Sequence, residues 1–218
     1  MRFLCKKSAM QVLVITSEQL KSELLSTKES QPVEVAWALN TADIPSKKFD
    51  ACIDLLFEPD TTRINWLQSL PCDCIVVNSV LEKLNSLPEN FIRINGWPTF
   101  LKREIVEAAC LQESNKDVVA EIFSLFGKGI QWVPDITGFL TPRVVASIIN
   151  EAFYALDENV STREEIDTAM KLGTNYPFGP FEWANKIGIE KVYALLGQLS
   201  AEDSRYKPSE LLKKTATR

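Results

Sequence analysis

The sequence contains no histidine in its 218 residues. Histidine is the usual general base at neutral pH, the base of Ser–His and Cys–His nucleophile systems, and the commonest zinc ligand. Each of those kinds of site is therefore excluded in its usual form.

Glycine is scarce as well, and its distribution is uneven. All eight glycines lie at or beyond Gly96, so the first 95 residues contain none. A loop that cradles a phosphate needs glycine for close backbone approach and for positive φ. The first half of the chain cannot build such a loop in its usual form.

Charge and hydropathy argue against two kinds of partner. The formal charge of −5 and a pI near 5.0 disfavour a nucleic-acid-binding protein, which normally carries a basic face. No run approaches the roughly 18 consecutive apolar residues of a transmembrane helix, so no membrane association is expected.

The cysteines indicate a reducing environment. There are five, an odd set without a CxxC pair, and the start "MRFLCKKSAM" is too short and too charged for a signal peptide. We therefore expect reduced thiols in a cytoplasmic protein. Cys72 and Cys74 flank Asp73 just before a predicted strand, and no metal site is expected there.

Residues 1–135 alternate strand and helix patterns. Short apolar runs predict strands at 10–16, 33–40, 49–58, 73–79, 90–96 and 130–135, and the stretch before the last run predicts a strand or bend and a helix. Mostly continuous apolar strands that alternate with helices are typical of a parallel sheet covered on both faces. The sequence thus predicts a Rossmann-like, doubly wound parallel sheet in an α/β domain.

Residues 136–218 change to helical periodicity. The long amphipathic run "LTPRVVASIINEAFYALDE" is followed by "STREEIDTAMKLG", with Ser161 or Thr162 as N-cap and Gly173 as C-cap. The run "PFEWANKIGIEKVYALLGQLS" predicts one or two more helices. An all-α C-terminal domain is therefore expected.

One stretch of this helical part is specific. Residues 165–192 read "EIDTAMKLGTNYPFGPFEWANKIGIEKV", which resembles the C-terminal domain of the 3-hydroxyacyl-CoA dehydrogenases, with its E-D-I-D-x-A-M-K-x-G-x-x-Y-P-x-G-P-F-E-L-x-D-x-x-G-L-D pattern. "DITGFLTPRVVASIINEAFYAL" and "RYKPSELLKK" resemble the start of that domain and its R-Y-x-P-S-P-L-L motif. The aromatic residues of the stretch are expected to pack rather than to contact a ligand; they are Tyr176, Phe178, Phe181 and Trp183.

The first half resembles the same family at three points. "FDACIDLLFEPD" is similar to the family's x-D-L-V-I-E-A-V-x-E strand, with Asp54 and Glu58 at its two glutamates. "VVNSVL" stands where the family has S-N-T-S-S-L, and "RINGWPTFLKREIVEAA" where it has G-L-H-F-F-N-P-x-x-x-M-x-L-V-E-V. In that match Glu107 takes the place of the family's glutamate and Asn95 the place of its histidine.

The resemblance implies an NAD-dependent oxidation of 3-hydroxyacyl-CoA in fatty-acid metabolism. In the family the histidine removes the hydroxyl proton while hydride passes to NAD, the glutamate orients the imidazole, and an asparagine helps position the substrate. This sequence departs from that pattern: "ITSEQLK" replaces the Gly-x-Gly-x-x-Gly turn, Asn40 the ribose-binding acid, Asn95 the histidine and Pro142 the asparagine. Only Glu107 keeps its identity, so a catalytically degenerate protein is expected.

The candidate site residues follow from these matches. Glu107 and Asn95 are the candidates for the catalytic position, and Glu58, Asn78 and Ser79 for nucleotide contact, because α/β sheets bind ligands at the carboxyl ends of strands. Glu107 is either a relic of the dyad or, the favoured interpretation, a solvated acid on a strand edge. Asn95 either faces a pocket or, again favoured, serves the turn "INGW".

Three function classes remain open. The chain is an active dehydrogenase with a divergent site, a pseudoenzyme that binds an acyl-CoA or a nucleotide without reacting it, or a dimeric scaffold without a small-molecule ligand. The family's helical domain forms its subunit contact, so the resemblance also implies an isologous homodimer.

Overall fold

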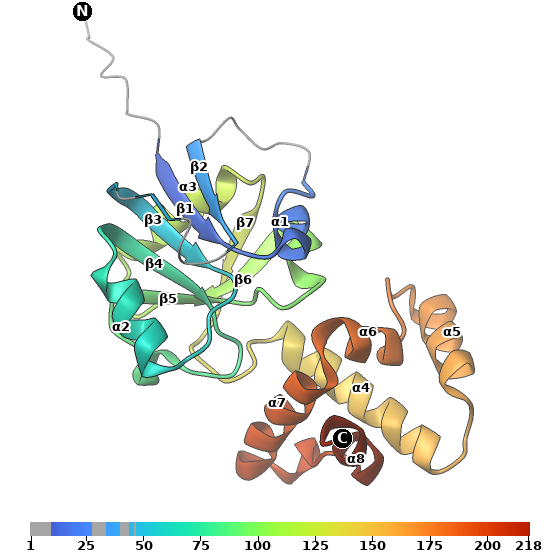
Figure 1. Ribbon diagram of the computed structural model, residues 1–218. Coiled ribbons are helices and arrows are strands. Elements are labelled where there is room, and N and C mark those ends of the chain that lie inside the picture. Colours follow the sequence, from blue (N-terminus) through green and yellow to red (C-terminus); the bar gives the residue numbers. More distant parts are fainter. Residues whose placement is uncertain (1–9, 28–33, 40–43, 46) are drawn as a thin grey trace, which may run out of the picture. The chain divides into compact units, whose positions relative to one another are not determined.

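The computed structural model describes residues 10–27, 34–39, 44–45 and 47–218 (Figure 1). They divide into two compact units. An α/β unit comprises the described residues up to Gly96 together with Phe100–Val133, and a helical unit comprises Trp97–Thr99 with Pro134–Arg218.

The α/β unit is built on one sheet with the strand order β2-β1-β3-β4-β5-β6-β7. The strands are β1 Gln11–Ile15, β2 Glu34–Ala38, β3 Phe49–Asp54, β4 Cys72–Asn78, β5 Phe91–Ile94, β6 Ile105–Ala109 and β7 Gly129–Trp132. Strands β1 to β5 are parallel, β6 is antiparallel to β5, and β7 is parallel to β6. The predicted Rossmann-like sheet is confirmed, although its last two strands run opposite to the rest.

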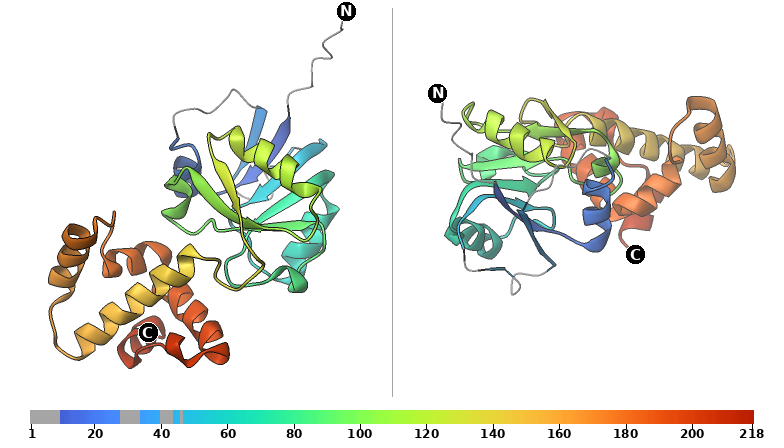
Figure 2. Two further views of the ribbon diagram at one scale, coloured as in Figure 1. Left: turned by 180° about the vertical axis from the view of Figure 1, so that it is seen from behind. Right: turned by 90° about the horizontal axis from the view of Figure 1, so that it is seen from above.

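Helices cover both faces of this sheet because successive strand residues point to opposite sides. Val12 and Val14 pack with apolar residues of α1 (Glu18–Leu24) and α3 (Asn115–Ser124). Leu13 and Ile15 belong to a second core on the other face, beneath α2 (Thr61–Ser69). Figure 2 shows α2 and α3 on opposite sides of the sheet. The chain leaves β1 toward β2 on one side and reaches β3 on the other, so the topological switch point lies between β1 and β3.

The helical unit contains five α-helices among its described residues. They are α4 Thr141–Asp157, α5 Arg163–Thr174, α6 Pro180–Ile187, α7 Ile189–Glu202 and α8 Glu210–Ala216. The described residues also form three short 3₁₀ helices: η2 Leu84–Ser86 and η3 Phe100–Lys102 in the α/β unit, and η4 Ser204–Tyr206 in the helical unit. Helix α4 buries one apolar stripe that includes Val145, Ile149 and Phe153. The part of the chain that the structure describes contains no helix long and apolar enough to cross a membrane.

Helix α5 begins and ends by defined capping. Thr162 is the N-cap: its Oγ1 accepts a hydrogen bond from the backbone N–H of Glu165, and the Glu165 carboxylate accepts the N–H of Thr162. At the other end the C-cap is Asn175, whose φ of 56° lies in the left-handed region. The prediction of Gly173 as C-cap was wrong by two residues, because an asparagine can also adopt that conformation.

The start of α6 explains why residues 176–180 are rich in proline and glycine. Both carboxylate oxygens of Asp167, a buried residue of α5, accept backbone N–H groups at the first turn of α6, from Phe181 at 2.8 Å and from Glu182 at 3.2 Å. A Cβ on Gly179 would lie 2.2 Å from Oδ1 of Asp167, so only glycine fits there. Trp183 packs against Tyr176 and Phe178, and Phe181 against Phe153. The stretch therefore fixes the corner between α5 and α6.

Candidate functional site

The two candidates for the catalytic position form one pair. Asn95 directly follows β5, and Glu107 lies in the middle of β6, opposite it in the antiparallel pairing. The side-chain Nδ2 of Asn95 donates to Oε2 of Glu107 at 3.0 Å, and the backbone N–H of Asn95 donates to the carbonyl oxygen of Glu107, also at 3.0 Å. Asn95 is 3% exposed and Glu107 is 7% exposed.

This geometry overturns the favoured interpretation of Glu107. Glu107 is not a solvated acid on a strand edge, because its side chain is buried and β6 lies between β5 and β7 in the sheet. The side-chain amide of Asn95 bonds across the sheet to Glu107. The pairing was not evident from the sequence, since nothing in the apolar pattern shows that β6 runs antiparallel to β5.

The pair lacks a proton acceptor at Asn95. A side-chain amide offers two N–H donors and one carbonyl oxygen, and it does not take up a proton at neutral pH. Removal of a hydroxyl proton during hydride transfer needs a base within hydrogen-bond reach. The arrangement orients an amide, where the family resemblance implies an imidazole.

Asn78 and Ser79, expected to contact a nucleotide, are turned to the protein instead. The Asn78 Nδ2 donates to the carbonyl oxygens of Leu55 and Gly96, both at 3.1 Å. The backbone N–H of Ser79 donates to the carbonyl oxygen of Ile94 at 3.2 Å, and the Oγ of Ser79 lies 3.5 Å from the carbonyl oxygen of Glu82. Glu58, the third candidate, is exposed beyond the end of β3.

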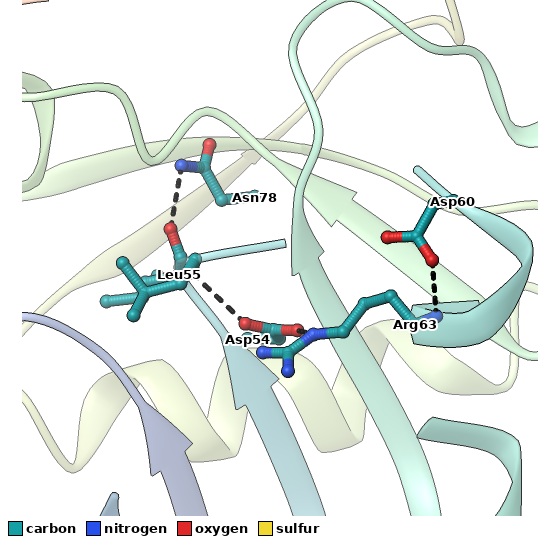
Figure 3. A network of polar contacts seen from close by, with 6 residues as sticks. Asp54, Leu55, Asp60, Arg63 and Asn78 are labelled. Atoms are coloured by element: carbon teal, nitrogen blue, oxygen red, sulfur yellow. Dashed lines mark hydrogen bonds and ion pairs between the residues drawn. The ribbon is translucent and has the colours of Figure 1, made fainter. Parts of the chain in front are cut away.

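A buried ion pair lies at the carboxyl end of β3, and it was missed as a site feature. Asp54 is fully buried, and its Oδ2 accepts a hydrogen bond from Nε of Arg63 at 2.7 Å, while its Oδ1 accepts the backbone N–H of Leu56 at 3.1 Å (Figure 3). Burial raises the pKa of the Asp54 carboxyl above its ordinary value, and the bond and charge of Arg63 oppose that shift only in part. The guanidinium of Arg63 also stacks over the ring of Trp66.

Arg93 is a second residue that sequence reasoning missed. It lies in β5 and is fully buried, with Nε donating to the carbonyl oxygen of Ser79 at 3.0 Å and a terminal nitrogen to that of Val80 at 3.2 Å. The available signal was a single cation inside the apolar run "FIRI". A buried arginine needs such acceptors. An arginine inside a buried strand therefore predicts hydrogen bonds from its side chain to the carbonyl groups of a neighbouring turn.

The turn between β1 and α1 does not fit the pyrophosphate of NAD, the cofactor that the resemblance implies. Thr16 is fully buried, and its N–H is donated to the carbonyl oxygen of Ala38. Ser17 caps α1 by accepting the N–H of Leu20, one of the amides that a phosphate would otherwise take. Neither residue has a positive φ. Asn40, at the ribose position, lies outside the described residues, and Pro142 is buried in the first turn of α4.

The described residues show no metal centre. No group of three or more acidic, cysteine or histidine side chains among them could hold a metal ion. Cys52, Cys72, Cys74 and Cys110 are free thiols. Burial raises the pKa of Cys72 to about 11 and that of Cys74 to about 12, so neither is a thiolate at neutral pH.

A Rossmann-like sheet followed by a separate helical unit places the protein in the class of α/β proteins with an all-α C-terminal domain. Residues 138–218 match the family model described as 3-hydroxyacyl-CoA dehydrogenase, C-terminal domain. The helical unit belongs to the 3-hydroxyacyl-CoA dehydrogenase family, and the similarity to curated relatives extends into the α/β unit.

Curated relatives support this assignment over part of their length. The chain is 42% identical over 92 residues to a 3-hydroxyadipyl-CoA dehydrogenase of Escherichia coli, and this alignment covers 41% of this chain and 19% of the relative. It is 30% identical over 167 residues to a probable 3-hydroxybutyryl-CoA dehydrogenase of Bacillus subtilis, covering 74% of this chain and 56% of the relative. The chain thus spans between about a fifth and just over half of the relatives' length.

Solved structures show the same fold. The crystal structure of an (S)-3-hydroxybutyryl-CoA dehydrogenase from Ralstonia eutropha superposes with a TM-score of 0.73 at 20% identity, over 96% of this chain and 94% of the other. A Mycobacterium tuberculosis structure, FadB2, also gives a TM-score of 0.73, at 14% identity over 96% of this chain and 94% of the other. At these identities the likeness concerns the fold alone.

Proposed function

We propose that this chain is a catalytically degenerate 3-hydroxyacyl-CoA dehydrogenase-like protein of fatty-acid metabolism, which binds a 3-hydroxyacyl-CoA without oxidising it. The observation that carries the proposal is the Asn95–Glu107 pair. The carboxylate that would orient a base is present and buried, while the group that it orients is an amide without basicity. The pair therefore holds the geometry of a dyad without its proton chemistry.

The substrate class rests on the relatives. Two curated relatives are named for 3-hydroxyadipyl-CoA and 3-hydroxybutyryl-CoA, so the proposed ligand is a short 3-hydroxyacyl-CoA. The specific part of the match lies in the helical unit, whose α5–α6 corner is intact, with Asp167 and Gly179 in close contact.

Isothermal titration calorimetry tests this function with two probes, 3-hydroxybutyryl-CoA and NAD, each added alone and both together. Heat of binding for the acyl-CoA, with no NADH absorbance in the recovered cell contents, is the expected result. NADH formation would make the protein an active dehydrogenase. The absence of binding heat with both probes would make the protein a scaffold without a small-molecule ligand. Either of these results overturns the proposal.

The proposal includes a homodimer formed through the helical unit. Helix α5 buries a single side chain, that of Asp167, and Leu172 on the same helix is 83% exposed. Val160, just before α5, and Val144 on α4 are exposed as well. Light scattering after size exclusion should give twice the chain mass of 24.6 kDa, and Leu172→Asp should lower it toward the monomer. A wild-type monomer would contradict this part.

A further inference from the structure

The carboxyl edge of the sheet at the switch point is where doubly wound folds bind a dinucleotide. In this chain the ends of β1 and β3 meet there directly. The backbone N–H of Leu55 donates to the carbonyl oxygen of Ile15 at 2.9 Å, which extends the β1–β3 ladder to its last residue. The polar groups just beyond these ends determine whether a ligand has anything to bind.

Asn78 uses its amide to join three strand ends. Its Nδ2 donates to the carbonyl oxygen of Leu55, after β3, and to that of Gly96, after β5, and its Oδ1 accepts the N–H of Gly96 at 2.9 Å. Both N–H donors and the carbonyl oxygen are therefore engaged within the protein. Figure 3 shows the amide of Asn78 directed at the carbonyl group of Leu55. We call Leu55, Asn78 and Gly96 the Asn78 clasp.

The Asn78 clasp is closely packed as well as hydrogen-bonded. A Cβ added to Gly96 would lie 2.8 Å from Cγ of Asn78, closer than side chains approach one another. Glycine at position 96 thus lets the backbone after β5 lie directly on the amide. The space between Asn78 and the end of β5 is therefore taken by this chain's own backbone.

The neighbouring turns are held in the same way. Arg93 fixes the carbonyl groups of Ser79 and Val80 after β4, and Arg63 neutralises Asp54 at the end of β3. Asn78, Arg93 and Asp54 are thus each hydrogen-bonded to other groups of the protein. The β1–α1 turn contains no glycine, and the N–H of Leu20 in α1 is taken by Ser17.

We infer that the Asn78 clasp is a structural replacement for a dinucleotide site, so that the α/β unit neither binds NAD nor needs it for stability. Asn78 holds the end of β5 in place, and through Gly96 it holds the adjacent Asn95 opposite Glu107. The inference deepens the proposed function and rests on it, because it gives the reason why hydride transfer has no acceptor.

Thermal unfolding with and without NAD tests this inference on the full chain. For the wild type, 1–5 mM NAD, a concentration on the order of a thousandfold above tight-site affinities, should leave Tm unchanged. Asn78→Asp removes both donors while it keeps the shape of the side chain, and it should lower Tm by roughly 5–10 °C. Asn85→Asp is the matched control, because Asn85 is exposed in η2, and its Tm should stay within about 1 °C of the wild type.

Two results would overturn the inference. One is a rise in wild-type Tm with NAD that Asn78→Asp abolishes, which would make Asn78 a cofactor contact. The other is an Asn78→Asp variant as stable as Asn85→Asp. If Asn78→Asp fails to fold, amide hydrogen exchange of the wild type tests the inference instead. The Gly96 N–H should be strongly protected from exchange, and NAD should not change that protection. Fast exchange of this N–H would contradict the Asn78 clasp. NAD binding without NADH formation sinks this inference alone, whereas NADH formation sinks the proposed function.

Discussion

Asn95 donates two hydrogen bonds to one residue, Glu107, from its side-chain Nδ2 to Oε2 and from its backbone N–H to the carbonyl oxygen, both at 3.0 Å. The two residues face one another across antiparallel strands and are almost fully buried. A buried carboxylate needs such a donor, because an unpaired charge is costly away from water. The amide at position 95 therefore stabilises Glu107 although it has no basicity.

Asn95→Asp should convert this pair into two buried carboxylates. Like charges at hydrogen-bond distance raise the pKa of one of them, so the variant loses stability as pH rises through that raised pKa. We expect the free energy of unfolding to fall by about 2–4 kcal/mol at pH 7, and the deficit to shrink below about pH 4. Urea unfolding at several pH values measures this, with Asn85→Asp as the exposed control. A deficit that does not change with pH would contradict the pairing.

Asn95→His restores the residue type that the family resemblance implies, beside a carboxylate that could orient it. A positioned acid–base group contributes about a hundred- to ten-thousandfold in rate. We nevertheless expect no NADH formation from 3-hydroxybutyryl-CoA and NAD, because the β1–α1 turn offers no site for the pyrophosphate. Absorbance at the NADH band measures it, with Asn85→His as the control. NADH formation by Asn95→His would show that a cofactor site survives.

The sequence predicted much of the fold and less of the site. Continuous apolar strands predicted β1 to β5, and the dense motif from Asp135 to Lys214 predicted the helical unit, because both patterns are local. The antiparallel β6 and the pairing of Asn95 with Glu107 depend on contacts between distant segments, which periodicity does not reveal. Asn78 was assigned to a ligand because of its place at a strand end, and the donors and acceptors that engage it lie 18 and 23 residues away.

Gly179→Ala tests the α5–α6 corner. The added Cβ would lie 2.2 Å from Asp167 Oδ1 and would force the cap of α6 apart, so we expect a loss of about 2–3 kcal/mol in the free energy of unfolding. Gly197→Ala is the matched control, since it lies in α7 with nothing within 4 Å. The control should gain about 0.5–1 kcal/mol from helix propensity. Equal effects of the two variants in urea unfolding would refute the contact.

Glu182 makes the same corner sensitive to acid. The hydrogen bond from Lys171, followed by that from the N–H of Gly179, lowers the pKa of the Glu182 carboxyl below its ordinary value of 4.5. A carboxyl with a lowered pKa contributes stability above its unfolded pKa, and this is lost as pH falls through the folded value. Glu182→Gln should therefore reduce stability near pH 7 and flatten its decline below about pH 4.5. A wild-type-like decline in the variant, followed by circular dichroism, would count against the role of Glu182.

The most direct measurement is the steady-state formation of NADH by the wild-type chain, with saturating NAD and 3-hydroxybutyryl-CoA, beside an active 3-hydroxybutyryl-CoA dehydrogenase assayed in parallel. With an amide at position 95 and the Asn78 clasp in place of a dinucleotide site, the rate should lie at least about ten-thousandfold below that of the active enzyme. A rate within about tenfold of the active enzyme would contradict the loss of catalysis.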